Sequence, residues 1–365
     1  SFRPDMPNVD TNFTSTYTFE TSDIRDLWWK EFHDENLNSL VESALEKNTN
    51  LRIAYLNLEK AKASLGVAEA DLLPGVNLNA GATRTRNSAE TAAHMPQTTS
   101  KSYEINLGLN YEIDLWGRVR NSVLAANENL NASKFDYDSA RLSLSSSVAK
   151  SYFALVSLNM QEAVLKETLK TYEDTLALRK TQLDLGSINE MTYLQSKAEV
   201  ERAKTSLTSV LNSKSQALTS LAILTGKSND EILKGAVASA QNLPSSPEIK
   251  AGISSDVLLR RSDVAKALAD LKATNALVGV ARAQYFPTLS LTGLFGFASD
   301  EFDRIFMGSA SVWSLGANLT QKIFDYGRTK NNVRVAETNE QIAAITYEAT
   351  VRSALGEVRD CLLYT

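Results

Sequence analysis

The sequence is poor in the residues that build metal sites, disulfides and catalytic centres. Among its 365 residues it has one cysteine, Cys361, and two histidines, His33 and His94. A single cysteine excludes an internal disulfide framework, and two histidines leave little for a metal site. We therefore expect no catalytic residue, no metal and no cofactor, and an enzyme ranks last among the functions considered.

Long hydrophobic runs are also absent. No stretch approaches the roughly 18 consecutive apolar residues of a membrane-spanning helix. The net charge of -5 offers no basic patch for nucleic acid. Membrane strands stay compatible with the mean hydropathy of -0.22, because they alternate apolar and polar residues. No secretory signal peptide begins at Ser1, so we expect either a mature exported chain or a cytosolic one.

Proline and glycine are scarce, with 7 and 16 residues. Neither occurs in 118–185 or in 190–225, which predicts a long helical hairpin that turns at Gly186. The first helix alone would span about 100 Å at ~1.5 Å per residue, which no compact domain contains. The Ser-x-x-Glu sequence from Ser187 to Glu190 has the form of a capping box for the second helix. A seven-residue apolar spacing predicts coiled-coil packing: Leu142, Ala149, Val156 and Ala163.

Two stretches far apart in the chain are near copies of each other. Residues 66–74 and 279–287 share the pattern Gly-Val-Ala-x-Ala-x-x-x-Pro. In each, an Ala-rich helical pattern ends at a proline, Pro74 or Pro287. The first pattern runs from about Leu27 to Ala70, and the second starts at Ser255. A repeat indicates one supersecondary unit used twice.

After each proline the spacing of apolar residues changes from that of a helix to every second residue, as in a strand. Each copy then has two alternating runs, separated by a loop, of about the ~9–11 residues that a tilted strand needs to cross a bilayer. The apolar residues on one face of the four runs include Val76, Leu78, Ala80, Ile105, Leu107, Leu109, Leu289, Leu291, Phe295, Trp313, Leu315, Leu319 and Ile323. The opposite face carries small or polar residues.

Four strands of this length cannot close a barrel, and open edges in lipid are prohibitively costly. The chain must therefore oligomerise. Eight strands from a dimer would be filled with side chains, whereas about twelve begin to enclose water. The small and polar residues favour the wider barrel. The fold class predicted is an α+β membrane protein in which the helices leave one end of the barrel.

Four motifs carry a resemblance to a known family. They are the Trp28-Trp29-x-x-Phe32-x-Asp34-x-x-Leu37 segment, the paired Gly-to-Pro junctions, residues 111–118 (Tyr-Glu-Ile-Asp-Leu-Trp-Gly-Arg) and residues 253–264. Over residues 25–365 the chain resembles the outer membrane factor (TolC-like) family, most closely the branch that works with resistance-nodulation-division efflux pumps. The last motif usually has proline where this chain has Ser262.

The resemblance implies a homotrimer with a twelve-stranded barrel in outer-membrane lipid and a coiled-coil helical tunnel in the periplasm of a Gram-negative bacterium. It implies a passive exit duct for drugs and other toxic compounds. The partners would be a periplasmic adaptor protein and an inner-membrane transporter. Family members often begin with a lipidated cysteine, whereas this chain begins at Ser1.

The same resemblance divides the chain into segments. We expect an extended arm at 1–25, equatorial and upper periplasmic helices at 26–73 and the first barrel hairpin at 74–116. The long helical hairpin follows at 117–226, with an equatorial connection at 227–256. A helix of the second copy at 257–286 leads to the second barrel hairpin at 287–326. A second long helix begins at 327–365. It ends before any counterpart of the first turn, so we expect gaps in a tunnel wall made of these residues alone and no second set of gating acids.

Several residues are candidates for functional roles. An aromatic girdle is expected where the strands meet the helices: Trp116, Tyr285, Phe286 and Tyr326. The helix–strand junctions are marked by Pro74, Pro287, Gly117 and Gly327. The resemblance places an adaptor-contact tip at Asp184, Leu185, Gly186, Ser187 and Asn189. It places an equatorial turn at Arg260, Arg261 and Asp263.

Three alternatives stay open. A structural trimeric surface protein would have no water-filled lumen. Within the duct class, the chain could serve type I protein secretion or heavy-metal efflux. The Leu258-Leu259-Arg260-Arg261 segment favours drug efflux over protein secretion.

Overall fold

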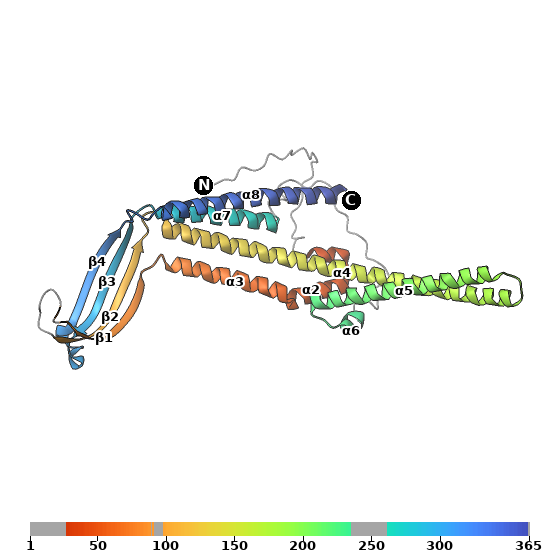
Figure 1. The fold of residues 1–365 in the computed structure, drawn as a ribbon, viewed down its shortest axis with the longest axis horizontal. Coiled ribbons are helices and arrows are strands. Elements are labelled where there is room, and N and C mark those ends of the chain that lie inside the picture. The colour runs from red at the N-terminus through yellow and green to blue at the C-terminus, as the bar shows by residue number, and fades with distance from the viewer. Residues whose placement is uncertain (1–26, 89, 91–97, 235–260, 364–365) are drawn as a thin grey trace. The chain divides into compact units, whose positions relative to one another are not determined.

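A computed structural model describes the chain at residues 27–88, 90, 98–234 and 261–363 (Figure 1). The fold divides into two compact units. Unit 1 holds the described parts of Asn57–Phe135 and Asp256–Arg359, and unit 2 those of Thr11–Leu56, Asp136–Ser255 and Asp360–Thr365. The expected arm at 1–25 and most of the connection at 227–256 lie outside the described residues, as do His94 and Arg260.

Unit 1 contains an antiparallel sheet of four strands in the order β1-β2-β3-β4. The strands are β1 (Gly75–Arg86), β2 (Thr99–Ile113), β3 (Thr288–Ser299) and β4 (Ser311–Thr320). They follow the alternating runs, although β4 ends before Ile323. Gly75 pairs with Asn110, and Thr288 pairs with Thr320. The strand ends that lead into helices therefore share one end of the sheet (Figure 1).

Unit 1 also holds two helices of the second copy, α7 (Ser262–Ala283) and α8 (Arg328–Leu363). A hydrophobic cluster joins them, with Val264, Leu271 and Ala354 buried. Alanine supplies much of the buried face of α7, which lets neighbouring helices approach closely. Arg261 is extended, so α7 begins at Ser262 and the expected helix start at Ser255 lies outside the described residues.

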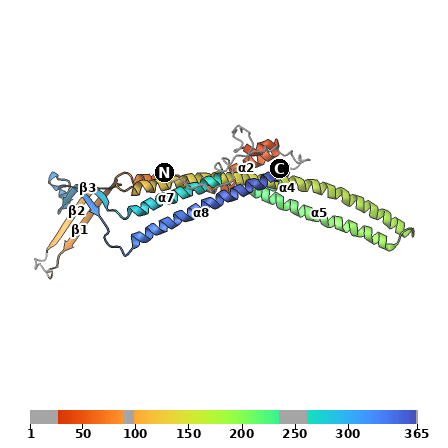
Figure 2. The same cartoon turned by 90° about the horizontal axis from the view of Figure 1, so that it is seen from above.

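Unit 2 is built on a helical hairpin. The long helix α4 (Arg118–Asp184) begins in unit 1, and α5 (Glu190–Thr225) returns beside it (Figure 2). The bounds of α4 and α5 coincide closely with the two segments that lack glycine and proline. The ammonium of Lys214 on α5 forms a salt bridge with the carboxylate of Glu162 on α4, with 2.7 Å between Nζ and Oε2. Of the four heptad positions, Ala149 and Val156 are buried, whereas Leu142 and Ala163 are exposed.

In the core of unit 2, short helices and the start of a longer one pack against this hairpin. They are η1 (Trp28–Phe32), α2 (Glu35–Lys47), the start of α3 (Thr49–Ala70) and α6 (Asn229–Ile232). Trp29, Tyr152 and Leu221 are fully buried at its centre. The helical pattern from about Leu27 to Ala70 divides into η1, α2 and α3. Asp34 and Asn48 break it, because each side chain accepts backbone N–H groups that open a new helix.

Candidate functional sites

The two faces of the sheet differ in chemistry across all four strands. The register aligns Leu78 with Leu107 and Phe295 with both Leu107 and Trp313. This face is exposed: Leu315 is 81% and Leu78 68% accessible. An exposed apolar surface of this extent marks a contact with membrane or protein. A sheet with one such face, flanked by polar residues on the other, has the pattern of a membrane strand set.

The opposite face is mostly polar, with Leu294 and Val312 as apolar members, and it is closely packed. Asn79 donates to the side-chain oxygen of Asn106 at 3.1 Å, and Asn106 is buried. A side chain at Gly296 would lie 2.3 Å from the carbonyl oxygen of Ile105. Only glycine permits this approach of two backbones. The face is lined by Asn77, Asn79, Glu104, Asn106, Asn110, Glu112, Ser290, Thr292, Ser314 and Asn318.

The outer strands leave the sheet with two open edges within the described residues. β1 pairs only with β2, and β4 pairs only with β3. All of β4 and nearly all of β1 is solvent-exposed. An edge strand presents unpaired N–H and C=O groups that template pairing with another chain.

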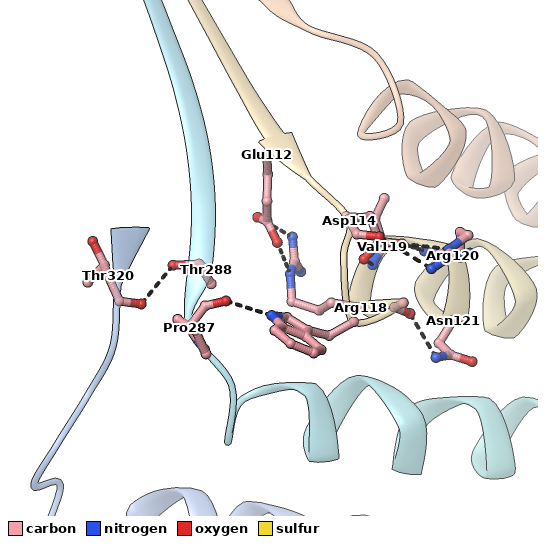
Figure 3. A network of polar contacts seen from close by, with 11 residues as sticks. Glu112, Asp114, Arg118, Val119, Arg120, Asn121, Pro287, Thr288 and Thr320 are labelled. Carbon is pink, nitrogen blue, oxygen red and sulfur yellow. Dashed lines mark hydrogen bonds and ion pairs between the residues drawn. The ribbon is translucent and has the colours of Figure 1, made fainter. Parts of the chain in front are cut away.

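The junction of β2 with α4 is held by charge (Figure 3). Arg118 donates two hydrogen bonds to Glu112, at 2.7 and 2.8 Å, and they raise the pKa of Arg118. Asp114 accepts the backbone N–H groups of Val119 and Arg120 at the first turn of α4. Burial would raise the pKa of Asp114, but these N–H groups outweigh it and lower the pKa. The carboxylate therefore stays charged and caps the helix.

The junction of β4 with α8 uses the same chemistry. Asp325 accepts the N–H groups of Gly327 and Thr329 at 3.0 and 2.8 Å. The hydroxyl of Thr329 also donates to Asp325, and these bonds lower the pKa of the carboxyl. Gly327 has φ +81°, and Gly117 at the first junction has φ +77°. Both need the left-handed conformation that glycine adopts without steric cost.

The four expected girdle residues all lie on exposed surface at this end of the sheet. Trp116 stacks on Phe286, with ring centroids 4.6 Å apart, and its indole N–H donates to the carbonyl of Pro287 at 2.8 Å. Tyr326 instead contacts Phe324, at 4.5 Å. α3 ends at Ala70, four residues before Pro74.

Sequence reasoning missed a second aromatic group, at the far end of the sheet. Tyr103 contacts Phe302 and Phe297 contacts Phe306, with centroids 5.6 and 5.9 Å apart. Phe302 and Phe306 are exposed and lie between β3 and β4. The two phenylalanines four residues apart in an inter-strand segment were the available signal.

The turn between α4 and α5 is a Schellman motif. The N–H of Ser187 donates to the carbonyl of Gln182, and that of Gly186 to Leu183, both at 2.8 Å. Gly186 has φ +74°. Leu185 projects at 75% exposure. The predicted capping box was wrong: Asn189, not Ser187, caps α5 by accepting the N–H of Thr192.

The described part of the predicted equatorial turn is an ion cluster in unit 1. Arg261 donates to Asp263 at 2.9 Å and to Glu357 of α8 at 2.6 Å. The hydrogen bond from Arg261 lowers the pKa of Asp263. Sequence reasoning did not find Glu357, which lies nearly a hundred residues away. The cluster joins the start of α7 to α8.

Two further observations concern the described residues only. They contain no group of three or more histidine, cysteine or acidic side chains that could hold a metal ion. No helix among them is long and apolar enough to cross a membrane.

Comparison with known proteins gives one consistent result. The family model described as outer membrane efflux protein matches residues 40–227 and 253–364. Outer membrane protein OprJ of Pseudomonas aeruginosa is 33% identical over 370 residues, which cover 99% of this chain and 75% of that protein. The cation efflux system protein CusC of Escherichia coli K12 is 30% identical, over 92% of this chain and 72% of the relative.

Solved structures agree with the sequence comparison. The CmeC outer membrane channel of Campylobacter jejuni superposes with a TM-score of 0.84 at 33% identity, covering 95% of this chain and 74% of that one. A structure of CusC superposes with a TM-score of 0.86 at 29% identity, covering 100% of this chain and 81% of that one.

The sheet with one exposed apolar face, joined to long helices, defines an α+β protein of the outer-membrane channel class. The chain belongs to the outer membrane efflux protein family. It is an outer-membrane efflux protein, as the resemblance predicted.

Proposed function

We propose that three copies of this chain form a passive duct, with a twelve-stranded barrel in the outer membrane and a helical tunnel in the periplasm. In this proposal the duct is the exit component of a tripartite pump. A periplasmic adaptor and an inner-membrane resistance-nodulation-division transporter deliver drugs or other toxic compounds to it. The two halves of the chain are an internal structural repeat.

One observation carries the proposal: a four-stranded sheet with an exposed apolar face, a polar face and two open edges. Lipid can cover the apolar face, but it cannot form hydrogen bonds with the unpaired backbone N–H and C=O groups of the edge strands. Pairing β4 of one copy with β1 of the next removes every edge. Twelve strands then place the polar face, including Asn77 and Asn106, around a water-filled lumen.

The repeat is supported by the two junctions. Each has a left-handed glycine, Gly117 or Gly327, and a carboxylate that accepts N–H groups of the following helix. Each helix before the strands ends beside a proline. A common local chemistry at two distant sites is the expectation for one supersecondary unit used twice.

The tip role of residues 184–189 is supported by their position and exposure. Leu185 and Met191 are exposed apolar residues on either side of a fixed turn. Apolar side chains held on a rigid turn suit a protein contact, because little conformational entropy is lost on binding. In this proposal they meet the adaptor.

Two measurements on the full-length protein test the duct. The first is the mass of the detergent-purified protein by native mass spectrometry, for which we expect three copies. The second is current through a planar bilayer, for which we expect stepwise single-channel conductance. A stable trimer that never conducts would favour the structural surface protein and overturn the duct.

Gene deletion tests the cargo. We expect deletion to increase susceptibility to antibiotics and bile salts, and wild-type protein to restore resistance. Increased susceptibility to metal cations alone would favour cation efflux, which the similarity to CusC makes the second candidate. Lost export of a protein with unchanged susceptibility would favour type I secretion.

The adaptor contact is tested by Leu185→Glu in the complementation strain. We expect resistance to fall while trimer mass and bilayer conductance stay unchanged. Full resistance with this variant would contradict the tip assignment.

A further inference from the structure

Each half of the repeat has a glycine on the helix before its strands and an asparagine in the first turn of the helix after them. The glycines are Gly66 and Gly279, each followed by Val-Ala. The asparagines are Asn121 and Asn331, each four residues after a left-handed glycine and three after an arginine. Both halves therefore contain the parts of the same contact.

Of Gly66 and Gly279, only Gly279 contacts one of these two asparagines within the described part of the chain. A Cβ at Gly279 of α7 would lie 2.8 Å from the amide carbon of Asn121 on α4. Asn121 is held there because its amide donates to the carbonyl of Gly117 at 2.7 Å. At Gly66 of α3, by contrast, an added Cβ would have no described atom within 4 Å.

The burial of the two helices shows the same asymmetry. Much of α7 is buried, whereas the single buried residue of α3, Leu51, lies outside its unit 1 segment. Val67 and Leu73 near Gly66 are 69% and 70% exposed. In the second half the residue that corresponds to Leu73 is Phe286, which Trp116 covers. Tyr326, which corresponds to Trp116, is 89% exposed.

We propose that Asn331 and Tyr326 of one copy pack against Gly66 and Leu73 of a second copy. This seam reproduces between subunits the contact that Asn121 and Trp116 make with Gly279 and Phe286 inside one subunit. It rests on the proposed trimer and specifies which helices join its subunits. The start of α8 of each copy packs on α3 of the next.

The geometry also accounts for closure into a ring. The donating surface, at the start of α8, differs from the receiving surface on α3. Such a head-to-tail interface generates a ring when its rotation closes, and not a two-fold dimer. The same direction joins β4 of one copy to β1 of the next, so strands and helices select the same neighbour.

Paired cysteines test the seam in the full-length protein, starting from Cys361→Ser. Gly66→Cys with Asn331→Cys should give dimers and trimers on non-reducing gels, because a disulfide needs Cβ atoms about 3.8 Å apart. Asn121→Cys with Gly279→Cys should form only an intrachain disulfide. Gly66→Cys with Asn339→Cys, two helical turns further along, should remain uncrosslinked.

The outcomes separate the seam from the trimer. If the Cys361→Ser protein is trimeric and the 121/279 pair oxidises, but the 66/331 pair does not, the seam is wrong and the trimer stands. If the protein is not trimeric in mass, both proposals fall.

A bulky residue at Gly66 supplies an independent test. Gly66→Leu has room within the chain, so helix content should be unchanged while the trimeric fraction falls at least tenfold. Ser64→Leu is the matched control. Its counterpart in α7, Leu277, is exposed even where the contact is made. An equal trimeric fraction for Gly66→Leu and Ser64→Leu would overturn the seam.

Discussion

The phenol of Tyr152, on α4, donates a 2.7 Å hydrogen bond to Asp34, the residue that caps α2. Tyr152 is fully buried. Burial and the neighbouring carboxylate both raise the pKa of the phenol, so it stays protonated and keeps donating. One carboxylate thus opens a helix and attaches it to the hairpin more than a hundred residues away.

We predict that Tyr152→Phe lowers the free energy of unfolding by about 1 kcal/mol, the usual contribution of one hydrogen bond. Asp34→Ala should cost more, about 2 kcal/mol, because it removes both the helix cap and the carboxylate that accepts the phenol O–H. Asp34→Asn is the control, since asparagine still accepts N–H groups. Denaturant unfolding followed by circular dichroism measures all three. Equal stability of Asp34→Ala and Asp34→Asn would contradict the capping role.

The stack of Trp116 on Phe286 leads to a second prediction. Trp116→Ala should lower thermal stability more than Trp116→Phe. The phenylalanine keeps the aromatic pair, which contributes about 0.5–1.5 kcal/mol, and loses only the bond to the Pro287 carbonyl. Differential scanning calorimetry of the detergent-purified protein gives the order of the two variants. Equal losses for the two variants would show that the hydrogen bond, not the ring, matters.

The left-handed glycines give a third prediction. Gly117→Ala and Gly327→Ala should each destabilise the protein by about 1–2 kcal/mol, because a Cβ disfavours positive φ. Gly356→Ala is the matched control. It lies within α8 with open space around it, and alanine there should be neutral or stabilising by up to about 1 kcal/mol. Thermal unfolding in detergent compares the three.

The two faces of the sheet give a fourth prediction. Leu78→Lys should reduce the assembled protein in outer-membrane fractions, because a lysine facing lipid costs about 2–4 kcal/mol near the bilayer centre. The neighbouring Asn77→Lys, on the polar face, should assemble nearly normally. Immunoblots of heated and unheated membranes measure the assembled fraction. Equal losses for both variants would contradict the assignment of the faces.

Glu162 gives the pH-dependent prediction. Hydrogen bonds from Lys166 and Lys214 lower its pKa below the ordinary value of 4.5. A carboxyl whose pKa is lower in the folded state contributes stability above its unfolded pKa, and loses it as the pH falls through the folded value. Glu162→Gln should therefore cost about 1 kcal/mol at pH 7 and progressively less below about pH 4.5.

Denaturant unfolding at pH 7, 5 and 3 checks this trend. Glu199→Gln, which breaks an exposed pair with Arg202, is the control and should change stability by less than about 0.5 kcal/mol. A cost for Glu162→Gln that does not vary with pH would point to packing instead of charge.

The long elements could be predicted because their signals are local. Alternation alone located β1 to β4, and the absence of glycine and proline located α4 and α5 almost to the residue. The shorter elements failed where two local signals compete. Asn48 interrupts a helical pattern that continues on both sides, and Ser187 and Asn189 both suit a helix N-terminus. The capping box forms instead at Ser228 and Glu231.

Most contacts at the candidate sites could not be predicted from the sequence, for a different reason. The girdle residues were named from their positions, but the partners of Trp116 depend on the pairing of β2 with β3 across the repeat. That pairing brings Trp116 to Phe286 and Pro287. The contacts of Arg261 with Glu357 and of Tyr152 with Asp34 likewise join distant segments, and a sequence pattern of fixed spacing does not report them.

The common register of the four strands also restricts how the protein can change its length. Insertion of one residue within β2 would shift every following side chain of that strand to the other face, exchanging Leu107 and Leu109 for Asn106 and Gly108. Strands of such a sheet can grow only by pairs of residues, and their neighbours must grow with them. The connection from Ser299 to Ser311 lies outside the strands and carries no such constraint, so diversification of this family should be tolerated there.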